Sequence, residues 1–416
     1  MGAIRGTLQV RNFAQIRQAR IEFGDLTVLV GPQGVGKSLL LQLWKLALDQ
    51  AEILTQLNNA GYGAETRREF LELYLGEGLA DAWSPKTVVK VDGARFIPLQ
   101  GYRHRSRLVG RVFYIPAHRA LLLAQGWPAP FSGLNQEIPA VARLFSHNLN
   151  QSFSDPHDYG LLFPWRGNLR ADFRKAVDEA IFHGGKVLVS RKQLRKRLEL
   201  KYGRNRMPFM TWTAGQREFA PLLLALLHLL PPGGGRAPGI EWVVLEEPEM
   251  GLHPQAISVA MIFALEMLSR GYRVVVSTHA PLVLDLVFAM TRLQESPLRR
   301  KAALLLRAFK LPNNKATWPV MNEALDKSYR TYALSFDERG TATTTDISRL
   351  DPSAANPSEA GWGGLTSFSG DFNSVVAEAV GARKQEAGAR GVSAAKFAAI
   401  QPVEGVHPDR STSSVG

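Results

Sequence analysis

The sequence predicts an α/β fold with a parallel core sheet, an antiparallel β-lobe and a helical lobe. Residues 26–30 form a short apolar run rich in β-branched residues, and a glycine-rich turn and an apolar helical segment at 38–49 follow it. Strands at 242–245 and 273–277 flank a helix at 254–270, which makes a βαβ unit whose strands should be parallel. The 416 residues are 45% hydrophobic and 21% charged, an ordinary globular composition.

The other elements follow from the same patterns. Strands 7–13 and 16–23 pair around Ala14, and 87–91 and 95–99 form a hairpin at Asp92-Gly93. We expect a surface helical segment at 51–79 and a mixed, mostly helical stretch at 121–185. Further predicted strands are 110–115, 186–190, 197–202, 329–336 and 341–346, and further predicted helices are 220–230, 281–292 and 299–310.

These elements predict one large head at 1–350, with an inserted β and helical lobe at about 51–210. A C-terminal extension follows at 351–416. From about residue 380 it is rich in Ala, Gly and Ser, which is typical of a loose tail.

Composition narrows the class of protein. The chain has no cysteine, which excludes disulfides and cysteine-ligated zinc. Residues 1–10 lack the apolar core of a signal peptide, and the most apolar stretch, around 220–230, is far shorter than the ~20 residues that span a membrane. We therefore expect a cytoplasmic protein without a membrane partner. The net charge of +13 favours an acidic partner such as nucleic acid, or equally a solvated basic surface.

A phosphate-binding loop follows the strand at 26–30. The run 31–38 fits the pattern GxxxxGK[ST], Walker A, between a strand and a helix. Its glycines let backbone N–H groups turn toward a phosphate, and the helix that starts near Lys37 points its positive end at the same anion. Lys37 would bridge the β- and γ-phosphates of ATP, and Ser38 would ligate Mg²⁺. The predicted nucleotide-binding residues here are Gly31, Gln33, Gly34, Val35, Gly36, Lys37, Ser38 and Leu39.

Two glutamates end the strand at 242–245, as in Walker B. A buried strand would deliver Glu246 to the Mg²⁺ shell and would leave Glu247 to polarise the attacking water. Adjacent acids are costly, because like charges disfavour each other's ionisation. The alternative is a surface turn carrying Glu246, Glu247 and Glu249, but Pro248 and the apolar run favour the carboxyl end of a strand, where ligands bind in open α/β sheets.

Four motifs, in their order along the chain, resemble those of ABC-type ATPases of the RecF and OLD kind. The first is the Walker A run 31–38 described above. The run 213–218 (TAGQRE) resembles the ABC signature, 246–254 (EEPEMGLHP) resembles the EEPExxLHP block, and 277–281 (STHAP) resembles the histidine switch. The resemblance covers the chain to about residue 290 and, more loosely, to about 350. It implies ATP hydrolysis with Mg²⁺ and face-to-face dimerisation.

The resemblance also implies roles for single residues. Glu246 takes the Mg²⁺-coordinating place, Glu247 the general-base place, and His279 would hydrogen-bond the γ-phosphate. Ala214, Gly215 and Gln216 would cap the γ-phosphate of the nucleotide on the opposing subunit, and 251–253 would lie at the dimer interface.

The sequence departs from the transporter pattern in two places. Transporters often have a glutamine after the strand equivalent to 112–115, whereas His118 or Arg119 stands there, and His118 is equally well explained as a packing or surface histidine. Glu246 replaces the usual aspartate, as it does in OLD-like proteins.

Other features of related proteins are missing. Heptad arms, a transmembrane domain and a DxD cluster after Pro281 are absent from the sequence, so SMC-type clamps, transporters and Toprim nucleases are disfavoured. A nuclease or toxin activity would then belong to a separate effector protein.

Two basic segments are candidates for nucleic-acid contact. The run from Arg191 to Arg206 is the densest, and Arg103, Arg105, Arg107 and Arg111 form the second. A solvated strand face or the docking site of an acidic protein would explain them equally well. Tyr102 and Tyr202 could stack on bases, although packing is the commoner role of a strand tyrosine.

Three functions remain open. The first is a regulatory ATPase that oligomerises and controls an effector, resembling the ATPase subunits of anti-phage systems such as the PARIS ATPase (AriA) and the Septu ATPase. The second is a RecF-like DNA-repair ATPase. The third is a scaffold that holds ATP without hydrolysing it.

Overall fold

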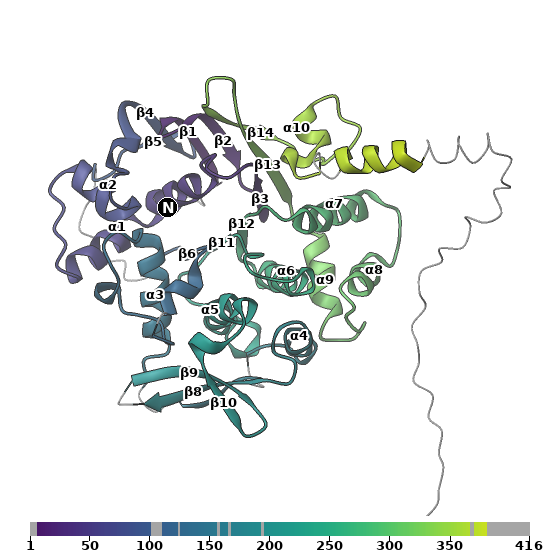
Figure 1. Ribbon diagram of the computed structural model, residues 1–416. Coiled ribbons are helices and arrows are strands. Elements are labelled where there is room, and N and C mark those ends of the chain that lie inside the picture. Colours follow the sequence, from purple (N-terminus) through teal and green to yellow (C-terminus); the bar gives the residue numbers. More distant parts are fainter. Residues whose placement is uncertain are drawn as a thin grey trace, which may run out of the picture. The chain divides into compact units, whose positions relative to one another are not determined.

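The β-branched runs of the sequence form the centre of a large mixed sheet. In the computed structural model, which describes residues 6–100, 110–123, 125–155, 159–164, 168–192, 195–366 and 370–380, ten of the described strands join in the order β5-β4-β1-β2-β14-β13-β3-β12-β11-β6 (Figure 1). The bounds are β1 Thr7–Phe13, β2 Ile16–Glu22, β3 Leu26–Val30, β4 Trp83–Val91, β5 Ala94–Phe96, β6 Val112–Ile115, β11 Trp242–Glu246, β12 Arg273–Ser277, β13 Tyr329–Phe336 and β14 Ala342–Asp346.

The central strands are parallel, which confirms the predicted βαβ unit. β11 pairs in parallel with β12 and with β6, and β3 pairs in parallel with β12 and β13. The hairpins β1–β2 and β13–β14 are antiparallel, as predicted. Since the carboxyl ends of parallel strands meet at one edge, the turns after β3, β11 and β12 lie close together.

Helices cover both faces of the central strands. Val28 and Val30 of β3 pack in one cluster with the apolar side chains of α5, α6 and α7, whereas Leu29 packs on the other face with α1. Burial on both faces explains why these strands are continuous apolar runs. The bounds are α1 Lys37–Asn59, α2 Arg67–Leu75, α3 Ala140–Ser152, α4 Ala171–Val177, α5 Ala214–Leu229, α6 Pro254–Ser269, α7 Pro281–Glu295, α8 Lys301–Ala308, α9 Trp318–Leu325 and α10 Pro357–Ala360.

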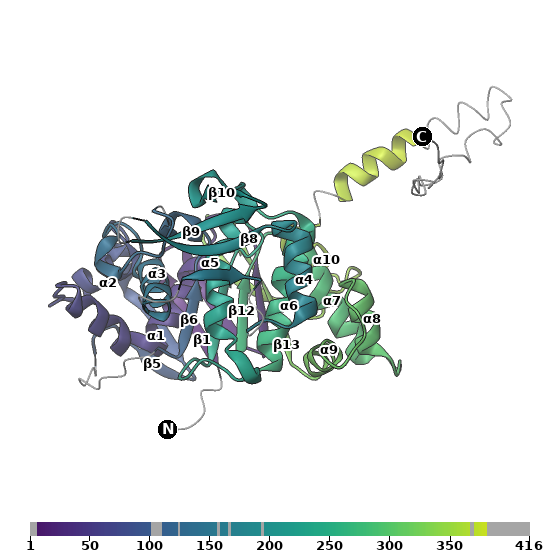
Figure 2. The same cartoon turned by 90° about the horizontal axis from the view of Figure 1, so that it is seen from below.

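A second sheet of four described strands forms the antiparallel lobe. Its order is β10-β9-β8-β7, and α5 lies between it and the strands of the large sheet (Figure 2). Leu198 and Leu200 of β9 are buried against this layer of helices. The bounds are β7 Gly160–Phe163, β8 Lys186–Lys192, β9 Arg195–Tyr202 and β10 Asn205–Pro208.

The chain divides into two compact units, 1–365 and 366–416. In the second unit, residues 370–380 form a helix. The predicted tail from 381 onward and the predicted roles of Tyr102, Arg103, Arg105 and Arg107 lie outside the described residues. In the part of the chain that the structure describes, every helix is too short or too polar to cross a bilayer.

Candidate functional site

The loop between β3 and α1 forms a cradle of the shape the sequence predicts. Gly31 has φ 141°, and a Cβ atom there would lie 2.3 Å from the carbonyl oxygen of Leu334 on β13, so a side chain does not fit. Gly34 and Gly36 also have positive φ, at 74° and 104°. Helix α1 begins at Lys37, which places the first unpaired N–H groups of the helix at the loop.

A cavity of about 190 Å³ opens on this cradle, and residues that are far apart in the sequence line it. Glu247 after β11 and His279 after β12 join the loop there, as does Gln15 from the β1–β2 turn. All eight predicted loop residues except Gly31 are among the lining residues, which are Gln15, Gln33, Gly34, Val35, Gly36, Lys37, Ser38, Leu39, Glu247 and His279.

Three polar side chains meet at one point of this cavity. Lys37 Nζ donates to the carbonyl oxygens of Gly31 at 2.8 Å and Pro32 at 3.0 Å, and it lies 3.0 Å from His279 Nε2. Glu247 Oε1 lies 3.4 Å from the same nitrogen. A neutral imidazole nitrogen either accepts from Lys37 or donates to Glu247, so the two contacts compete.

The electrostatics of the two glutamates differ. A hydrogen bond from His279 holds the pKa of Glu247 below its ordinary value against the effect of burial. Burial raises the pKa of the Glu246 carboxyl, and the neighbouring hydroxyl groups of Ser38 and Tyr114 oppose this rise only in part. Burial also lowers the pKa of the Lys37 ammonium, although the charges of Glu247, Glu249 and Glu246 oppose it.

The turn after β11 sends the adjacent carboxylates to different places. Glu247 has φ 40°, a left-handed conformation, and its N–H donates to the carbonyl oxygen of Ser277 at the end of β12. Glu246 stays in the strand with 6% exposure, while Glu247 is half-buried at the cavity. The turn therefore gives the two adjacent acids different surroundings, although the charge of Glu247 still raises the pKa of Glu246.

Glu246 fits a cation. Its Oε1 is buried and has no hydrogen-bond partner among the described residues, and such an orphaned oxygen is costly. Ser38 is its neighbour at the start of α1. Within the described residues no cluster of three or more His, Cys, Asp or Glu side chains could hold a metal by itself, so Mg²⁺ here would depend on phosphate oxygens of a nucleotide for further ligands.

Glu249 has a part that sequence reasoning missed. Its Oε1 accepts hydrogen bonds from the hydroxyl of Thr278, at 2.7 Å, and from the backbone N–H of His279. The Thr278 hydroxyl in turn accepts from Ala280 N at 2.9 Å. Glu249 therefore holds the loop that presents His279 to the cavity. Its position in the EEPE run was the signal that could have indicated this.

Arg119 is one of the two candidates for the transporter glutamine position. Its side chain lies against the backbone of the turn after β11. It is 1% exposed, and its guanidinium donates to the carbonyl oxygens of Glu246, Glu247 and Pro248 at 3.3–3.4 Å and to that of Glu218 at 2.9 Å. His118 is exposed, and its charge lowers the pKa of Glu247 slightly. Neither residue is among those lining the cavity.

The signature-like run caps helix α5. Thr213 accepts from the N–H of Gln216, whose side chain donates to Ile181 O at 3.1 Å and to the Tyr202 hydroxyl at 3.2 Å. The Gln216 side chain is thus turned inward, while Thr213 and Ala214 are exposed at the N-terminus of the helix. Tyr202 packs here, as the commoner role of a strand tyrosine predicts.

Gly215 joins the signature-like run to the segment after Glu249. A Cβ atom on Gly215 would lie 3.1 Å from the carbonyl oxygen of Gly251, so the two backbones are in close contact. Within the part of the chain that the structure describes, the residues lining the phosphate cradle do not include Ala214, Gly215 or Gln216. One chain therefore brings together the P-loop, Glu247 and His279, but leaves the N-terminus of α5 outside that cavity.

Gln15 was not predicted from the sequence. Its Nε2 donates to the carbonyl oxygen of Gly34 at 2.6 Å, which ties the β1–β2 turn to the P-loop. The pairing of β1 with β2 predicted the turn, but no local pattern marks the contact with a loop 19 residues later. The basic run 191–206 falls on the hairpin β8–β9 and on β10, away from the cradle; its residues Gln193 and Leu194 lie outside the described residues.

Comparison with known proteins gives one family match. A family described as "AAA domain, putative AbiEii toxin, Type IV TA system" matches residues 171–285. This range holds the N-terminus of α5, the glutamates after β11 and His279. No curated protein matches the chain.

Solved structures similar to the chain are remote. An SMC head domain from Thermotoga maritima is 12% identical, with 82% of this chain and 98% of that chain covered and a TM-score of 0.34. An SMC head bound to the C-winged helix domain of ScpA is 12% identical, covering 83% and 97% with a TM-score of 0.35. The dimeric bacterial ABC transporter cassette MJ0796 is 12% identical, covering 66% and 89% with a TM-score of 0.30.

The match to an AAA domain over residues 171–285, together with the P-loop, Glu247 and His279 in one cavity, indicates an ATPase with a P-loop nucleotide site.

Proposed function

We propose that two copies of this chain close face to face over Mg²⁺-ATP, hydrolyse it, and thereby control a separate effector protein, a nuclease or toxin, in anti-phage defence. The proposal rests on the separation of the cradle from the signature-like end of α5, which lie in two different places on one chain. Lys37, Glu247 and His279 meet within 3.0–3.4 Å in the cradle, while the N-terminus of α5 faces solvent elsewhere.

The residues of the cradle have complementary roles toward ATP. The P-loop N–H groups and Lys37 hold the β- and γ-phosphates. Ser38 and Glu246 would hold Mg²⁺, which screens the phosphate charge when bound. When the γ-phosphate attracts Lys37, the contact between Lys37 and His279 is released, and His279 Nε2 is free to donate to that phosphate.

Glu247 is the proposed general base. A glutamate carboxyl is ordinarily ionised near neutral pH, so Glu247 can accept a hydrogen bond from a water in line with the γ-phosphate. Glu249 and the left-handed turn at Glu247 fix the directions of His279 and the base, which is the positioning that phosphoryl transfer requires.

The second copy would complete the site. Thr213 and Ala214 are exposed at the N-terminus of helix α5, and a helix N-terminus favours an anion. Facing another copy, this end would cap the γ-phosphate held by that copy's cradle. Since Gly215 packs on Gly251, the segment 251–253 would lie at the same interface.

The effector and the defence role rest on less direct support. The matched family is described as a putative AbiEii toxin of a type IV TA system, which favours a protein that works as a toxin or with one. Stand-alone ATPases of this build resemble subunits of anti-phage systems, which is an analogy at the level of the fold.

The test is the Glu247→Gln variant of the full chain. We expect ATP turnover to fall by a factor of about 10² or more, because one positioned base contributes about 10²–10⁴. ATP binding should be retained, and the variant should accumulate as an ATP-bound dimer in size-exclusion chromatography with light scattering. Glu323→Gln, a change on the distant helix α9, is the matched control and should leave turnover unchanged. Unchanged turnover in Glu247→Gln would exclude Glu247 as the base.

A DNA-repair ATPase of the RecF kind is the second candidate, favoured by the basic hairpin β8–β9. It predicts that double-stranded DNA stimulates turnover and that charge reversal on the hairpin abolishes the stimulation. A scaffold that only holds ATP predicts no turnover in the wild-type chain although Glu247 is intact. Steady-state phosphate release with and without DNA separates the three.

A further inference from the structure

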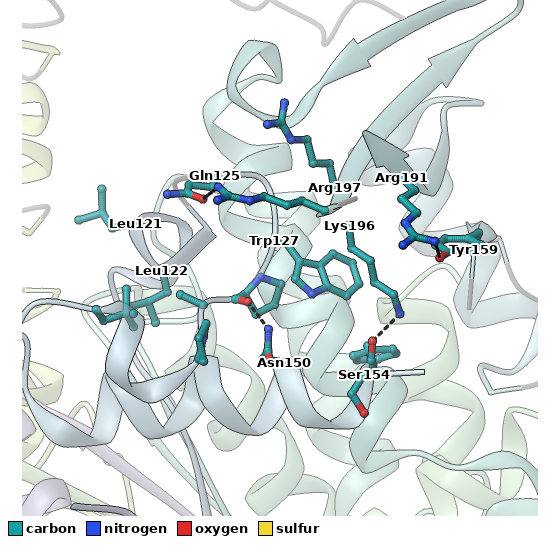
Figure 3. A pocket seen from close by; sticks show the side chains of 17 residues that line it. Leu121, Leu122, Gln125, Trp127, Asn150, Ser154, Tyr159, Arg191, Lys196 and Arg197 are labelled. Atoms are coloured by element: carbon teal, nitrogen blue, oxygen red, sulfur yellow. Dashed lines mark hydrogen bonds between the residues drawn. The ribbon is translucent and has the colours of Figure 1, made fainter. Parts of the chain in front are cut away.

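A second and larger cavity lies in the antiparallel lobe. Its volume is about 710 Å³, against about 190 Å³ for the phosphate cradle, and the two share no lining residue. It is lined by residues of the segments 121–123 and 125–134, by the C-terminal end of α3, by Tyr159 and by strands β8 and β9 (Figure 3). Leu198 N of β9 donates to Gly126 O at 2.8 Å, which fixes the loop against the hairpin.

The charged side chains among the described residues that line this cavity are all positive. Arg191, Arg195, Lys196 and Arg197 line it, and the described residues that line it include no aspartate or glutamate. Four cations around one concave surface without a carboxylate create a positive potential that attracts anions. The chemistry of the cavity therefore points to an anionic ligand.

Two of these cations already have partners. Lys196 Nζ donates to Phe153 O at 2.6 Å and Asp155 O at 2.5 Å, and Arg191 donates to the Tyr159 hydroxyl at 3.1 Å. These contacts shape the wall of the cavity.

The other two are available to a ligand. Arg195 has only a 3.4 Å contact with Gln125 Oε1, and the Arg197 side chain has no hydrogen bond or ion pair within the described part of the chain. Arg195 and Arg197 are two residues apart on β9, so their side chains leave the same face of the strand. Both line the cavity, so each is available there to an anionic group of a ligand.

Aromatic rings stand beside the cations. Trp127 is half-buried, packs edge-on against Phe153 at 6.4 Å, and has Lys196 Nζ 5.5 Å from its ring centroid. Tyr159 is 38% exposed, and Arg191 lies 6.0 Å from its ring centroid. Figure 3 shows Trp127, Lys196, Arg191 and Tyr159 along one wall. Flat rings next to cations suit a ligand that is both aromatic and anionic.

We propose that this cavity binds a phosphorylated nucleotide, with its base on Trp127 or Tyr159 and its phosphate on Arg195 and Arg197. The nucleotide is either free or at the end of a single strand, because both present the same chemistry. The volume lies in the range of about 300–1,000 Å³ that holds small ligands. An acidic peptide would use the cations but would leave the rings without a partner. The inference stands independently of the proposed hydrolysis.

The test is a binding titration on the full chain carrying Lys37→Met, which weakens nucleotide binding in the phosphate cradle and leaves the lining of the second cavity unchanged. The probe is a fluorescent hexathymidylate with a 5′-phosphate, followed by anisotropy, and the competitors are AMP, adenosine and hexaglutamate. The variant Arg195→Glu/Arg197→Glu removes the two available cations. Arg204→Glu/Arg206→Glu reverses two exposed charges of the same sheet outside the cavity and is the matched control.

We expect the cavity variant to weaken probe binding about tenfold or more and the control about twofold or less. AMP should compete and adenosine should not. Competition by AMP as strong as that of unlabelled hexathymidylate identifies a free nucleotide, and competition at least tenfold weaker identifies a strand end. Equal losses in both variants, no probe binding, or equal competition by hexaglutamate would overturn the proposal. None of these outcomes depends on ATP turnover or on Glu247.

Discussion

Replacement of Lys45 by methionine should destabilise the head strongly, because Lys45 is the only cation of a buried ion cluster among the described residues. Its side chain is 2% exposed, and Nζ donates to Asp49 Oδ2 at 2.8 Å, Glu52 Oε2 at 2.7 Å and Val112 O at 2.8 Å. Methionine keeps the length of the side chain but leaves two buried carboxylates without their cation and the carbonyl of Val112 without this donor. Breaking a buried pair in this way costs about 3–5 kcal/mol.

That loss is a large part of the about 5–15 kcal/mol that typically separates folded from unfolded chains. The free energy of unfolding can be measured by urea titration with tryptophan fluorescence. Lys86→Met, on an exposed position of β4, is the control and should change it by about 0.5 kcal/mol or less. A loss below about 1 kcal/mol in Lys45→Met would refute the ion-cluster reasoning.

The pH dependence follows from the same contacts. Burial alone would lower the pKa of Lys45, but the carboxylates of Asp49 and Glu52 raise it above its ordinary value. A lysine whose pKa is higher in the folded chain than in the unfolded chain stabilises the fold. This stabilisation is complete below the pKa of the unfolded chain, about 10.4, and is lost as the pH rises through the pKa of the folded chain. The difference between wild type and Lys45→Met should therefore be constant from about pH 6 to 9 and shrink only above the unfolded pKa.

Three further changes have defined outcomes. Glu249→Ala removes the acceptor for the backbone N–H of His279. ATP turnover in a phosphate-release assay should therefore fall about 10- to 100-fold, with ATP affinity unchanged. Turnover equal to that of the wild type would show that Glu249 does not orient His279. Gly31→Ala places a Cβ 2.3 Å from a carbonyl oxygen, so thermal unfolding without nucleotide should come at a lower temperature than in Gly34→Ala, where the space is open; the reverse order would contradict the clash. Arg119→Met should cost about 3 kcal/mol or more in a urea titration, since several buried carbonyl groups lose their donor, and a loss below 1 kcal/mol would contradict this.

The strands and the phosphate loop could be predicted from the sequence because their signals are local. The apolar run 26–30 and the run 242–245 are short, β-branched and followed by turn residues, and both are central strands. The parallel pairing of 242–245 with 273–277 followed from the helix between them, since a crossover of that length allows it.

The end of the first helix shows where local signals fail. The sequence indicated an end at Asp49, and the backbone of Asp49 is indeed non-helical, with φ −125°, but α1 resumes and continues to Asn59. Asp49 leaves the helical conformation where its carboxylate accepts the N–H groups of Arg111 and Val112, at 2.7 and 2.8 Å. Those partners lie more than sixty residues away, so the sequence near Asp49 cannot distinguish a kink from an end.

The candidate site was predictable in its motifs and less so in its side-chain directions. Glu247, His279 and Lys37 reach one cavity as their positions at strand ends imply. Gln216 turns inward because Ile181 O and the Tyr202 hydroxyl, both from the inserted lobe, accept its amide hydrogens. Gln15 and Arg119 act through backbone carbonyls of distant segments, and carbonyl positions depend on the tertiary fold alone.

Arg119 has a consequence for how a closed pair would work. Its guanidinium joins the turn that carries Glu246 and Glu247 to the carbonyl of Glu218 in the first turns of α5. In the proposed pair, the turn serves the ATP of its own subunit, while α5 covers the ATP of the neighbour. A shift of the turn on hydrolysis would pass through one rigid side chain to the neighbour's nucleotide. The two active sites would then hydrolyse ATP cooperatively, and the dependence of turnover on ATP concentration would have a Hill coefficient above one.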